Sequence, residues 1–223
     1  MDLAKSYDFF KPEECTETIH IIGCGSVGST VAENLVRFGL KDIVLYDFDY
    51  VEARNIANQM FTSKDIGRLK VEALADMLAA INPDVTEDLQ LMNEGWIGQK
   101  LYGYVFLCVD NIELRRKIAE ENKGNPSIKG MFDFRTALTD AQHYAADWKK
   151  IDMVKSFINT MNFSHEEAKV EAPVSACNVE LSVCPTIRII VGLGVSNFIN
   201  FLQGKPLKKV IIADAFGHKT TAF

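Results

Sequence analysis

The chain has 223 residues, of which 48% are hydrophobic and 24% are charged, and a formal net charge of −6. This composition is ordinary for one soluble globular domain, and the acidic balance without a basic run argues against a nucleic-acid-binding protein. The longest apolar stretch, residues 187–201, is interrupted by Arg188 and by two asparagines, so we do not expect a membrane span.

The cysteines and the N-terminus indicate the compartment. Five cysteines, an odd number, occur without a CxxC pair. Such a set is typical of a reducing environment rather than of a disulfide scaffold. The N-terminus lacks the basic-then-apolar layout of a signal peptide. We therefore expect a cytoplasmic protein.

The first predicted elements form a strand–helix–strand unit. Residues 18–22 are a β-branched run that ends in glycine, residues 26–38 carry apolar side chains at helical spacing, and residues 42–46 form a second apolar run. Parallel strands joined in this way bind ligands beyond their carboxyl ends. We expect a ligand site at that edge.

The later elements continue this alternation and then lose it. The first of them are predicted as a helix over 68–81, strands over 85–92, 103–109 and 127–132, and a helix over 112–122. They are followed by a segment of mixed pattern over 135–148 that is consistent with antiparallel strands, polar helices over 151–162 and 164–170, a long apolar helix over 185–202 and a final strand over 209–213. We expect one Rossmann-like α/β domain over residues 1–223, doubly wound with a mostly parallel sheet. An inserted segment, at about 135–177, is expected to cover the carboxyl edge of the sheet.

A glycine-rich turn joins the first strand to the first helix. Gly23, Gly25 and Gly28 match the dinucleotide fingerprint, in which the first permits a tight turn, the second lets a phosphate approach the backbone and the third lets the helix pack on the strand. Ser26 opens the helix, whose N-terminus attracts negative charge. The turn predicts a nucleotide site; a turn that only packs is the alternative.

Two aspartates follow the second predicted strand. Asp47 lies at the distance expected of a carboxylate that accepts hydrogen bonds from ribose hydroxyls. This position fits NAD and ATP equally well. For Asp49 we favour a structural role.

A further group of polar residues separates these two ligands. Lys70 opens the next predicted helix, where its cation can reach phosphate oxygens, although an ordinary solvated lysine is the alternative. Asp110 ends a buried strand, where a carboxylate can hold Mg²⁺ against phosphates; capping of the helix at residue 112 is the alternative. Before Lys70, the segment that follows the predicted strand over 42–46 contains a cluster of polar residues that packing of a hydrophobic core does not explain: Arg54, Asn55, Asn58 and Gln59.

Taken in order, these residues resemble the ThiF/MoeB and ubiquitin-activating enzyme superfamily. The family pattern is a glycine turn, D-x-D-x-V, N-x-x-R-Q, a lysine after a glycine, and a strand that ends in D-N-x-x-x-R. The matching stretches are DFDYVEARNIANQ from Asp47, GRLK ending at Lys70 and DNIELR from Asp110. The similarity covers residues 19–115 and resumes over 177–202.

The resemblance implies adenylation. The C-terminal carboxylate of a small ubiquitin-like or sulfur-carrier protein that ends in glycine would attack the α-phosphate of ATP and expel pyrophosphate. By the same resemblance Asp47 would hold the ribose, Asn55 and Lys70 would contact the phosphates, and Asp110 would bind Mg²⁺. Because members of this family tend to be homodimers, the resemblance also implies that this protein is a homodimer.

The chain departs from the family pattern at its arginines and at its zinc motifs. Asn58 stands where the family has an arginine, and no arginine precedes Arg37, so the arginine that many members lend to a partner subunit is absent. Arg54 and Arg68 are the candidates to replace the missing group. Because the paired CxxC motifs of many members are also absent, we expect no zinc.

Three residues near the predicted insertion carry further expectations. Cys177 lies in a segment that resembles the cysteine-containing stretch of thioester- or persulfide-forming relatives, whose thiol attacks the adenylate; a buried, unreactive thiol is an equal alternative. Cys184 fits packing better than catalysis. Arg135 fits either contact with a phosphate or with the carrier's tail, or a surface salt bridge.

Two other functions are consistent with the sequence. A degenerate family member would bind a ubiquitin-like protein without adenylating it, as Asn58 permits. A nicotinamide-dependent oxidoreductase would explain Gly23 to Asp47 but would leave Asn55, Lys70 and Asp110 without a role. A tRNA-modifying dehydratase of the same family is disfavoured by the acidic charge.

Overall fold

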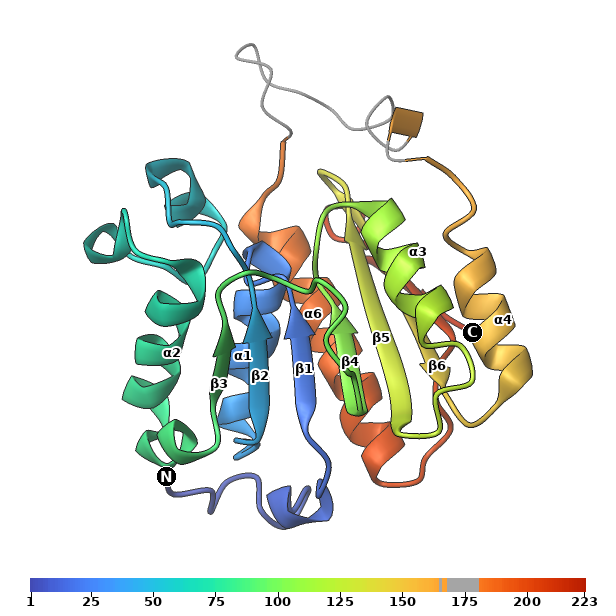
Figure 1. Cartoon of the computed structure of the whole chain (residues 1–223), viewed down its shortest axis with the longest axis horizontal. Coiled ribbons are helices and arrows are strands. Elements are labelled where there is room, and N and C mark those ends of the chain that lie inside the picture. Colours follow the sequence, from blue (N-terminus) through green and yellow to red (C-terminus); the bar gives the residue numbers. More distant parts are fainter. Residues whose placement is uncertain (165, 168–180) are drawn as a thin grey trace.

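The computed structural model describes residues 1–164, 166–167 and 181–223. Its centre is an eight-stranded sheet in the order β3-β2-β1-β4-β5-β6-β7-β8, with helices on both faces (Figure 1). Strands β3 to β5 pair in parallel and strands β5 to β8 pair antiparallel. The predicted Rossmann-like α/β fold is confirmed, with an antiparallel extension at one end.

The parallel half of the sheet follows the βα alternation. Its elements are β1 (Ile19–Ile22), α1 (Ser26–Arg37), β2 (Ile43–Tyr46), α2 (Lys70–Ile81), β3 (Gln90–Met92), β4 (Gly103–Leu107), α3 (Ile112–Glu121) and β5 (Ile128–Thr136). Short 3-10 helices lie at Pro12–Glu14, Ala53–Ala57, Ser63–Asp65 and Pro83–Glu87. The second half contains β6 (Asp140–Asp147), α4 (Ile151–Asn159), α6 (Cys184–Leu202), β7 (Val210–Asp214) and β8 (Lys219–Ala222).

The helices divide the core into two layers. Helices α1, α2 and α6 bury their apolar sides on one face of the sheet, and α3 and α4 do so on the other. Every residue of β1 and β2 is buried, because alternate side chains enter opposite layers: Ile21 and Leu45 enter the first, Ile22 and Val44 the second. This arrangement leaves the carboxyl ends of β1, β2 and β4 at one edge.

One predicted strand begins later than its apolar residues indicate. The predicted strand over 85–92 is a 3-10 helix, Pro83–Glu87, followed by a strand only from Gln90. Asn82 caps this helix, since its side chain accepts a hydrogen bond from the Asp84 N–H at 3.3 Å. Proline is favoured at the first helical position, so the local turn chemistry overrides the apolar pattern.

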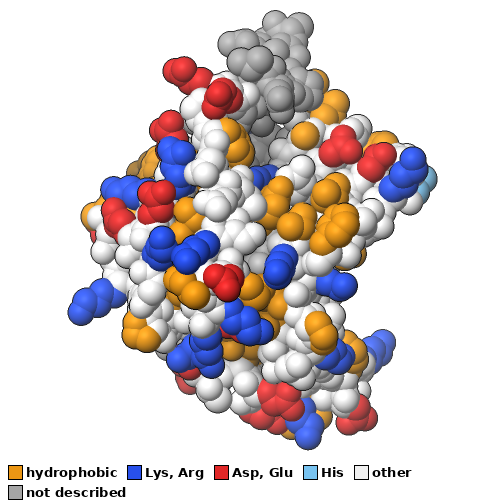
Figure 2. Space-filling view, turned by 90° about the vertical axis from the view of Figure 1, so that its right-hand side faces the viewer, with side chains coloured by type: hydrophobic (Ala, Val, Ile, Leu, Met, Phe, Trp, Pro, Cys, Tyr) orange, Lys and Arg blue, Asp and Glu red, His pale blue; other side chains and the backbone are white. Residues whose placement is uncertain are grey.

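The sheet extends further at its antiparallel end than the sequence predicted. Strand β6, which falls within the predicted insertion of residues 135–177, pairs with both β5 and β7. Strand β7 is not the last one, because Asp214 accepts a hydrogen bond from the Gly217 N–H at 2.7 Å in a turn that returns the chain as β8. All four residues of β8 are exposed; Figure 2 faces this side, where apolar and basic side chains are interspersed.

Helix α6 is a core helix. Its most apolar window has a mean hydropathy of 1.3, so that by length and composition alone it could cross a membrane, but half of that window is buried in the fold. It packs on α1 and on strands β5 and β6. Gly194 permits the close approach to the sheet, because a Cβ at this position would lie 2.2 Å from Cε1 of Phe134.

His143 on β6 is buried and joins the sheet to α6. Its Nδ1 lies 3.1 Å from the carbonyl oxygen of Asp133, and its Nε2 lies 3.2 Å from the side-chain nitrogen of Asn197. These partners fit a neutral ring that donates through Nδ1 and accepts through Nε2. Burial lowers the pKa of His143 to about 4.

The free energy of unfolding is expected to fall as the pH drops below 6.5. The unfolded chain protonates His143 near pH 6.5, whereas the folded chain does so only at about 4, so acid favours unfolding within this window by up to about 1.4 kcal/mol per pH unit. Urea titrations at several pH values in this window measure the slope. His143→Gln should reduce the slope without abolishing it, because burial also lowers the pKa of His20 to about 4. An unchanged slope would contradict this assignment.

Candidate functional site

The glycine turn between β1 and α1 is built by close backbone contacts. Gly23 has a φ of +96°, and a Cβ there would lie 2.8 Å from the carbonyl carbon and oxygen of Cys108. A Cβ on Gly28 would lie 1.8 Å from the carbonyl oxygen of Gly23. Both positions therefore require glycine for packing, and together they hold the turn against the end of β4.

Gly25 differs from its two neighbours because the space beside it is open. Among the described residues, the one atom that a Cβ added at Gly25 would meet is Nε2 of Gln59, at 4.0 Å. Gly25 is the N-cap of α1, and no side chain caps the helix. The first N–H groups of α1 thus face a place where an anion can approach the backbone.

Gly25→Ala is expected to weaken nucleotide binding by about tenfold or more while leaving the fold intact. The added methyl group has room among the described residues, but it occupies the space that a phosphate needs to reach the helix N-terminus. Calorimetry with Mg·ATP and thermal unfolding of both proteins measure the two quantities. Equal affinities would mean that the turn only packs.

Asp47 connects the glycine turn to the loop that follows β2. Its Oδ2 accepts a hydrogen bond from the Cys24 N–H at 2.6 Å and its Oδ1 accepts one from the Asp49 N–H at 2.9 Å. The carboxylate is buried, and burial raises its pKa above the usual value. Asp47 therefore holds the glycine turn and the loop after β2 together, in addition to any hydrogen bond that it accepts from a ribose hydroxyl.

Lys70 is a buried lysine at the beginning of α2. Its Nζ lies 2.7 Å from Oδ2 of Asp49, and its backbone N–H donates to the carbonyl oxygen of Asp49 at 2.9 Å. The Lys70 side chain is 9% exposed, whereas that of Asp49 is 53% exposed. Lys70 thus differs from an ordinary solvated lysine, and Asp49 fixes its position. The lysine is also near enough to Asp47 to oppose the rise of that carboxyl group's pKa.

The polar loop over residues 54–59 divides into local and site-facing side chains. Asn55 accepts a hydrogen bond from the Glu52 N–H at 2.8 Å in a capping box, and Arg54 forms an exposed ion pair with Glu52 at 2.5 Å. Asn58 is the C-cap of the same 3-10 helix. These contacts hold the conformation of the loop. The guanidinium of Arg54 is directed at the neighbouring Glu52.

Gln59 is the residue of this loop that sequence reasoning undervalued. Its Oε1 is buried without a hydrogen-bond partner among the described residues, and its Nε2 is the group nearest to the open side of Gly25. A buried amide oxygen without a partner is costly, so this group is available to a ligand. Its place in the polar cluster was the available signal.

Asp110 lies beyond the end of β4 with an exposed carboxylate. Among the described residues, no hydrogen bond or ion pair occupies its side chain. The alternative role as helix cap belongs to its neighbour, since the Asn111 side chain accepts from the Leu114 N–H at 2.9 Å. The backbone of Val109, directly before Asp110, lies 2.9 Å from the position of a Cβ on Gly23, so Asp110 follows directly on the strand end that contacts the turn.

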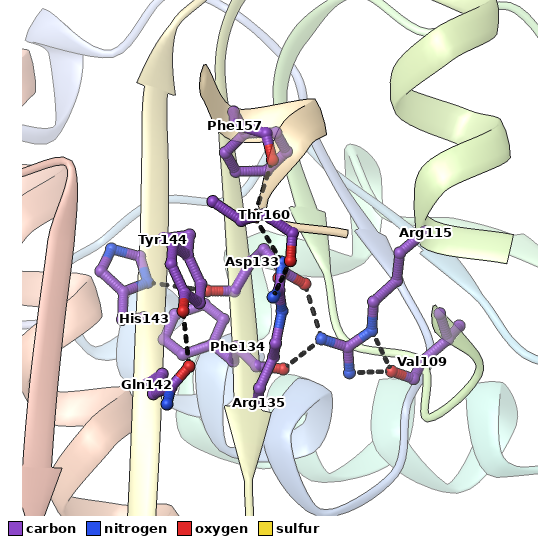
Figure 3. Close-up of polar contacts among 10 residues, drawn as sticks. All are labelled: Val109, Arg115, Asp133, Phe134, Arg135, Gln142, His143, Tyr144, Phe157 and Thr160. Atoms are coloured by element: carbon purple, nitrogen blue, oxygen red, sulfur yellow. Dashed lines mark hydrogen bonds and ion pairs between the residues drawn. The ribbon is translucent and has the colours of Figure 1, made fainter. Parts of the chain in front are cut away.

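A buried ion-pair cluster fixes the ends of β4 and β5 (Figure 3). Asp133 is fully buried and binds two guanidinium groups, that of Arg115 through Oδ1 at 2.6 Å and that of Arg135 through Oδ2 at 2.7 Å. Arg115 also donates through Nε to the carbonyl oxygen of Val109 at 2.7 Å. The last arginine of the DNIELR stretch thus holds the peptide that leads into Asp110.

Arg135 is an internal residue rather than a surface one. Besides Asp133, it donates to the carbonyl oxygen of Thr160 at 2.7 Å and to its Oγ1 at 2.8 Å, and its guanidinium lies 4.2 Å from the ring centre of Tyr144. Of the two alternatives for Arg135, the structure shows a salt bridge, and it is partly buried rather than at the surface because the strand places Asp133 and Arg135 on the same side. The N–H donors of the Arg135 guanidinium thus bind Asp133 and Thr160 of the chain itself.

Three of the described cysteines, Cys15, Cys24 and Cys108, are not activated thiols. Burial raises the pKa of Cys24 and of Cys108 far above the usual range and that of Cys15 to about 11. Cys184 is half-buried at the beginning of α6. The predicted nucleophile, Cys177, lies outside the described residues.

The family model described as "ThiF family" matches residues 15–221. The chain belongs to the ThiF family. Among relatives of this ThiF protein, ubiquitin-like modifier-activating enzyme 5 of Drosophila persimilis is 33% identical over 134 residues, which is 53% of this chain and 34% of the relative. The protein of the same name from Bombyx mori is 35% identical over 117 residues, 46% of this chain and 30% of the relative. The chain thus spans about a third of the length of the curated relatives that it matches.

Solved structures share the ThiF fold. E. coli MccB, solved with ATP, has a TM-score of 0.70 and 17% identity, over 95% of this chain and 65% of that one. PaaA has a TM-score of 0.66 and 18% identity, over 100% of this chain and 68% of that one. At these identities the likeness concerns the fold alone.

Proposed function

We propose that this ThiF protein adenylates the C-terminal carboxylate of a small ubiquitin-like or sulfur-carrier protein with ATP. The observation that carries the proposal is the open backbone at Gly25, with a buried, carboxylate-held Lys70 at the same edge of the sheet and an exposed Asp110 beyond β4 that has no partner among the described residues. A dinucleotide oxidoreductase needs neither of these charged groups. The names of the curated relatives agree with this chemistry.

The reaction exchanges one phosphorus–oxygen bond for another. A carboxylate oxygen of the carrier's last residue forms a bond to the α-phosphorus of ATP, and the bond from that phosphorus to the bridging oxygen breaks. Pyrophosphate leaves with the electron pair, and the carrier becomes an acyl adenylate. Such a transfer depends mainly on aligning two anions and neutralising the charge between them.

Each residue has a place in this scheme. The N–H groups at the start of α1, beside Gly25 and Ser26, would receive a phosphate, Asp47 would accept a ribose hydroxyl, and Lys70 would neutralise phosphate oxygens. Asn55 and Asn58 would contribute to nucleotide binding from the loop that also carries Gln59. A second step, attack of the Cys177 thiolate on the carbonyl carbon of the acyl adenylate, would form a thioester with the carrier and release AMP.

Magnesium fits the carboxylate that Asp110 offers. Mg²⁺ is commonly held by one or two carboxylates together with substrate phosphates and water, so a single unpaired carboxylate beyond β4 is a sufficient protein ligand. The ion supplies charge neutralisation at the phosphates. The described residues contain no cluster of three or more metal-binding side chains. We further propose that the protein acts in the cytoplasm as a homodimer.

A binding module without catalysis is the second candidate. The observation that favours it is the engagement of Arg54 with Glu52 and of Arg68 with Asp65 and Asp76, which leaves the arginine position of the family pattern, Asn58, without a replacement on this loop. Such a protein would bind a ubiquitin-like partner and release no pyrophosphate.

Calorimetry with Mg·ATP and with NAD tests the proposal. We expect ATP to bind, NAD to be silent, and Lys70→Ala to abolish ATP binding, whereas Lys64→Ala, an exposed lysine on the 3-10 helix Ser63–Asp65, should leave binding unchanged. Binding of NAD with an affinity that Lys70→Ala does not change would indicate an oxidoreductase. Binding of ATP without pyrophosphate release in the presence of carrier proteins that end in glycine would indicate the binding module.

A further inference from the structure

The candidate nucleotide site is short of positive charge. Three carboxylates, those of Asp47, Asp49 and Asp110, follow strands at this edge of the sheet, and Lys70, the buried lysine there, already pairs with Asp49 at 2.7 Å. A triphosphate carries several further negative charges. Binding it at this edge therefore requires a cation beyond Lys70 and the metal ion.

Most of the arginines are committed to carboxylates of the chain. Among the described residues, Arg37, Arg54, Arg68, Arg115 and Arg135 all form ion pairs. Two arginines do not: Arg116, whose contact is the carbonyl oxygen of Met161 at 3.4 Å, and Arg188, which is half-buried on α6. Arg116 belongs to α3, on the opposite face of the sheet from α1.

Arg188 lies beside the first turns of α1. Its Nη1 donates to Oγ1 of Thr30 at 2.6 Å, although the two residues are 158 positions apart. Thr30 in turn donates to the carbonyl oxygen of Ser26 at 2.7 Å. Both helices begin at the same edge of the sheet and pack against each other, so the guanidinium is about one helical turn, about 6 Å, from the N–H groups beside Gly25.

We propose that Arg188 is a phosphate-binding residue of this site, an inference that rests on the proposed function. The N-terminus of a helix carries a partial positive charge, so a guanidinium next to it that has no carboxylate partner among the described residues is electrostatically unfavourable until an anion arrives. A polyphosphate that enters at Gly25 meets both groups. Guanidinium donors beyond the one used by Thr30 form charge-assisted hydrogen bonds to its oxygens. Arg188 thereby supplies, from α6, the cation that Asn58 does not.

The test compares substitutions that separate phosphate binding from helix packing. Arg188→Gln should weaken Mg·ATP binding by about 10- to 100-fold, as expected for the loss of a charged hydrogen bond, and should leave the weaker binding of adenosine unchanged. Arg188→Lys should retain part of the affinity. Thr30→Val removes the hydroxyl partner but keeps the cation, so ATP should still bind. Arg116→Gln is the matched control.

The outcomes distinguish this inference from the function on which it rests. If the unaltered protein does not bind Mg·ATP, the proposed function fails and this inference fails with it. If the unaltered protein binds Mg·ATP and Arg188→Gln binds it equally well, only the inference is overturned. If Thr30→Val and Arg188→Gln lose the same thermal stability and neither loses affinity, Arg188 is a structural tie between α1 and α6.

Discussion

Asp110→Asn is expected to lower the rate of ATP–pyrophosphate exchange by about 100- to 1000-fold, which is typical for the loss of one charged group that acts in the transition state. Asparagine keeps the size of the side chain but removes the charge that would hold Mg²⁺ against the phosphates. Because Asp110 is exposed and the cap of α3 is Asn111, the free energy of unfolding should change by less than about 0.5 kcal/mol.

Asn111→Ala is the matched control for this prediction. It should destabilise the fold by about 1 kcal/mol, because α3 loses the acceptor for the Leu114 N–H, while exchange activity at a temperature well below unfolding stays close to normal. If Asp110→Asn retained full exchange at saturating magnesium, Asp110 would not be the metal ligand. A loss of both activity and folding would show that the carboxylate is structural.

Asp133→Asn is expected to lower the free energy of unfolding by about 3–5 kcal/mol, the cost of removing one partner from a buried ion pair. Two guanidinium groups, those of Arg115 and Arg135, would lose a carboxylate that binds them at 2.6 and 2.7 Å. A loss of this size is a large fraction of the stability of a typical domain. Urea unfolding of both proteins at neutral pH measures it.

Asp110→Asn also serves as the control for Asp133→Asn, because the two changes are chemically identical. One carboxylate is exposed and the other is fully buried, so the first variant should lose activity and keep its stability, whereas the second should lose stability. Similar midpoints of unfolding for the two variants would mean that the cluster contributes little. The pair of variants therefore separates the groups that carry chemistry from those that hold the site.

Local signals made the parallel half of the fold predictable. The run that forms β1, the glycines after it and the helical spacing of α1 are all contiguous, so the first βαβ unit is nearly complete within residues 19–46. The contiguous elements also predicted that Asp47 and Asp110 follow strands and that Lys70 begins a helix. Because the carboxyl ends of parallel strands meet at one edge of the sheet, these residues were expected near one site. Backbone contacts at Gly23 and Gly28 then follow from the fingerprint.

The residues that sequence reasoning misplaced depend on partners distant in the chain or on geometry within a strand. Strand β6 lies in the segment predicted as mixed or antiparallel and pairs locally with β5, but its second pairing, with β7, joins residues far apart in the chain, which no local pattern encodes. For Arg135 the sequence left open a contact with a phosphate or the carrier's tail and a surface salt bridge, whereas its partner Asp133 is buried two positions earlier on the same side of the strand. Arg188 was considered only as an interruption of an apolar stretch, because nothing local connects it with Thr30.

The pairing of β6 with β7 has a consequence for how the chain is made. Val210 follows Asp147 by 63 residues, so during synthesis β6 is an uncovered edge strand while α4 and α6 emerge. An unpaired edge with buried positions such as His143 and Ala145 offers a template to other nascent chains. We therefore expect ribosome-bound chains that stop before residue 210 to associate with holdase chaperones, and this association to end once β7 has left the exit tunnel.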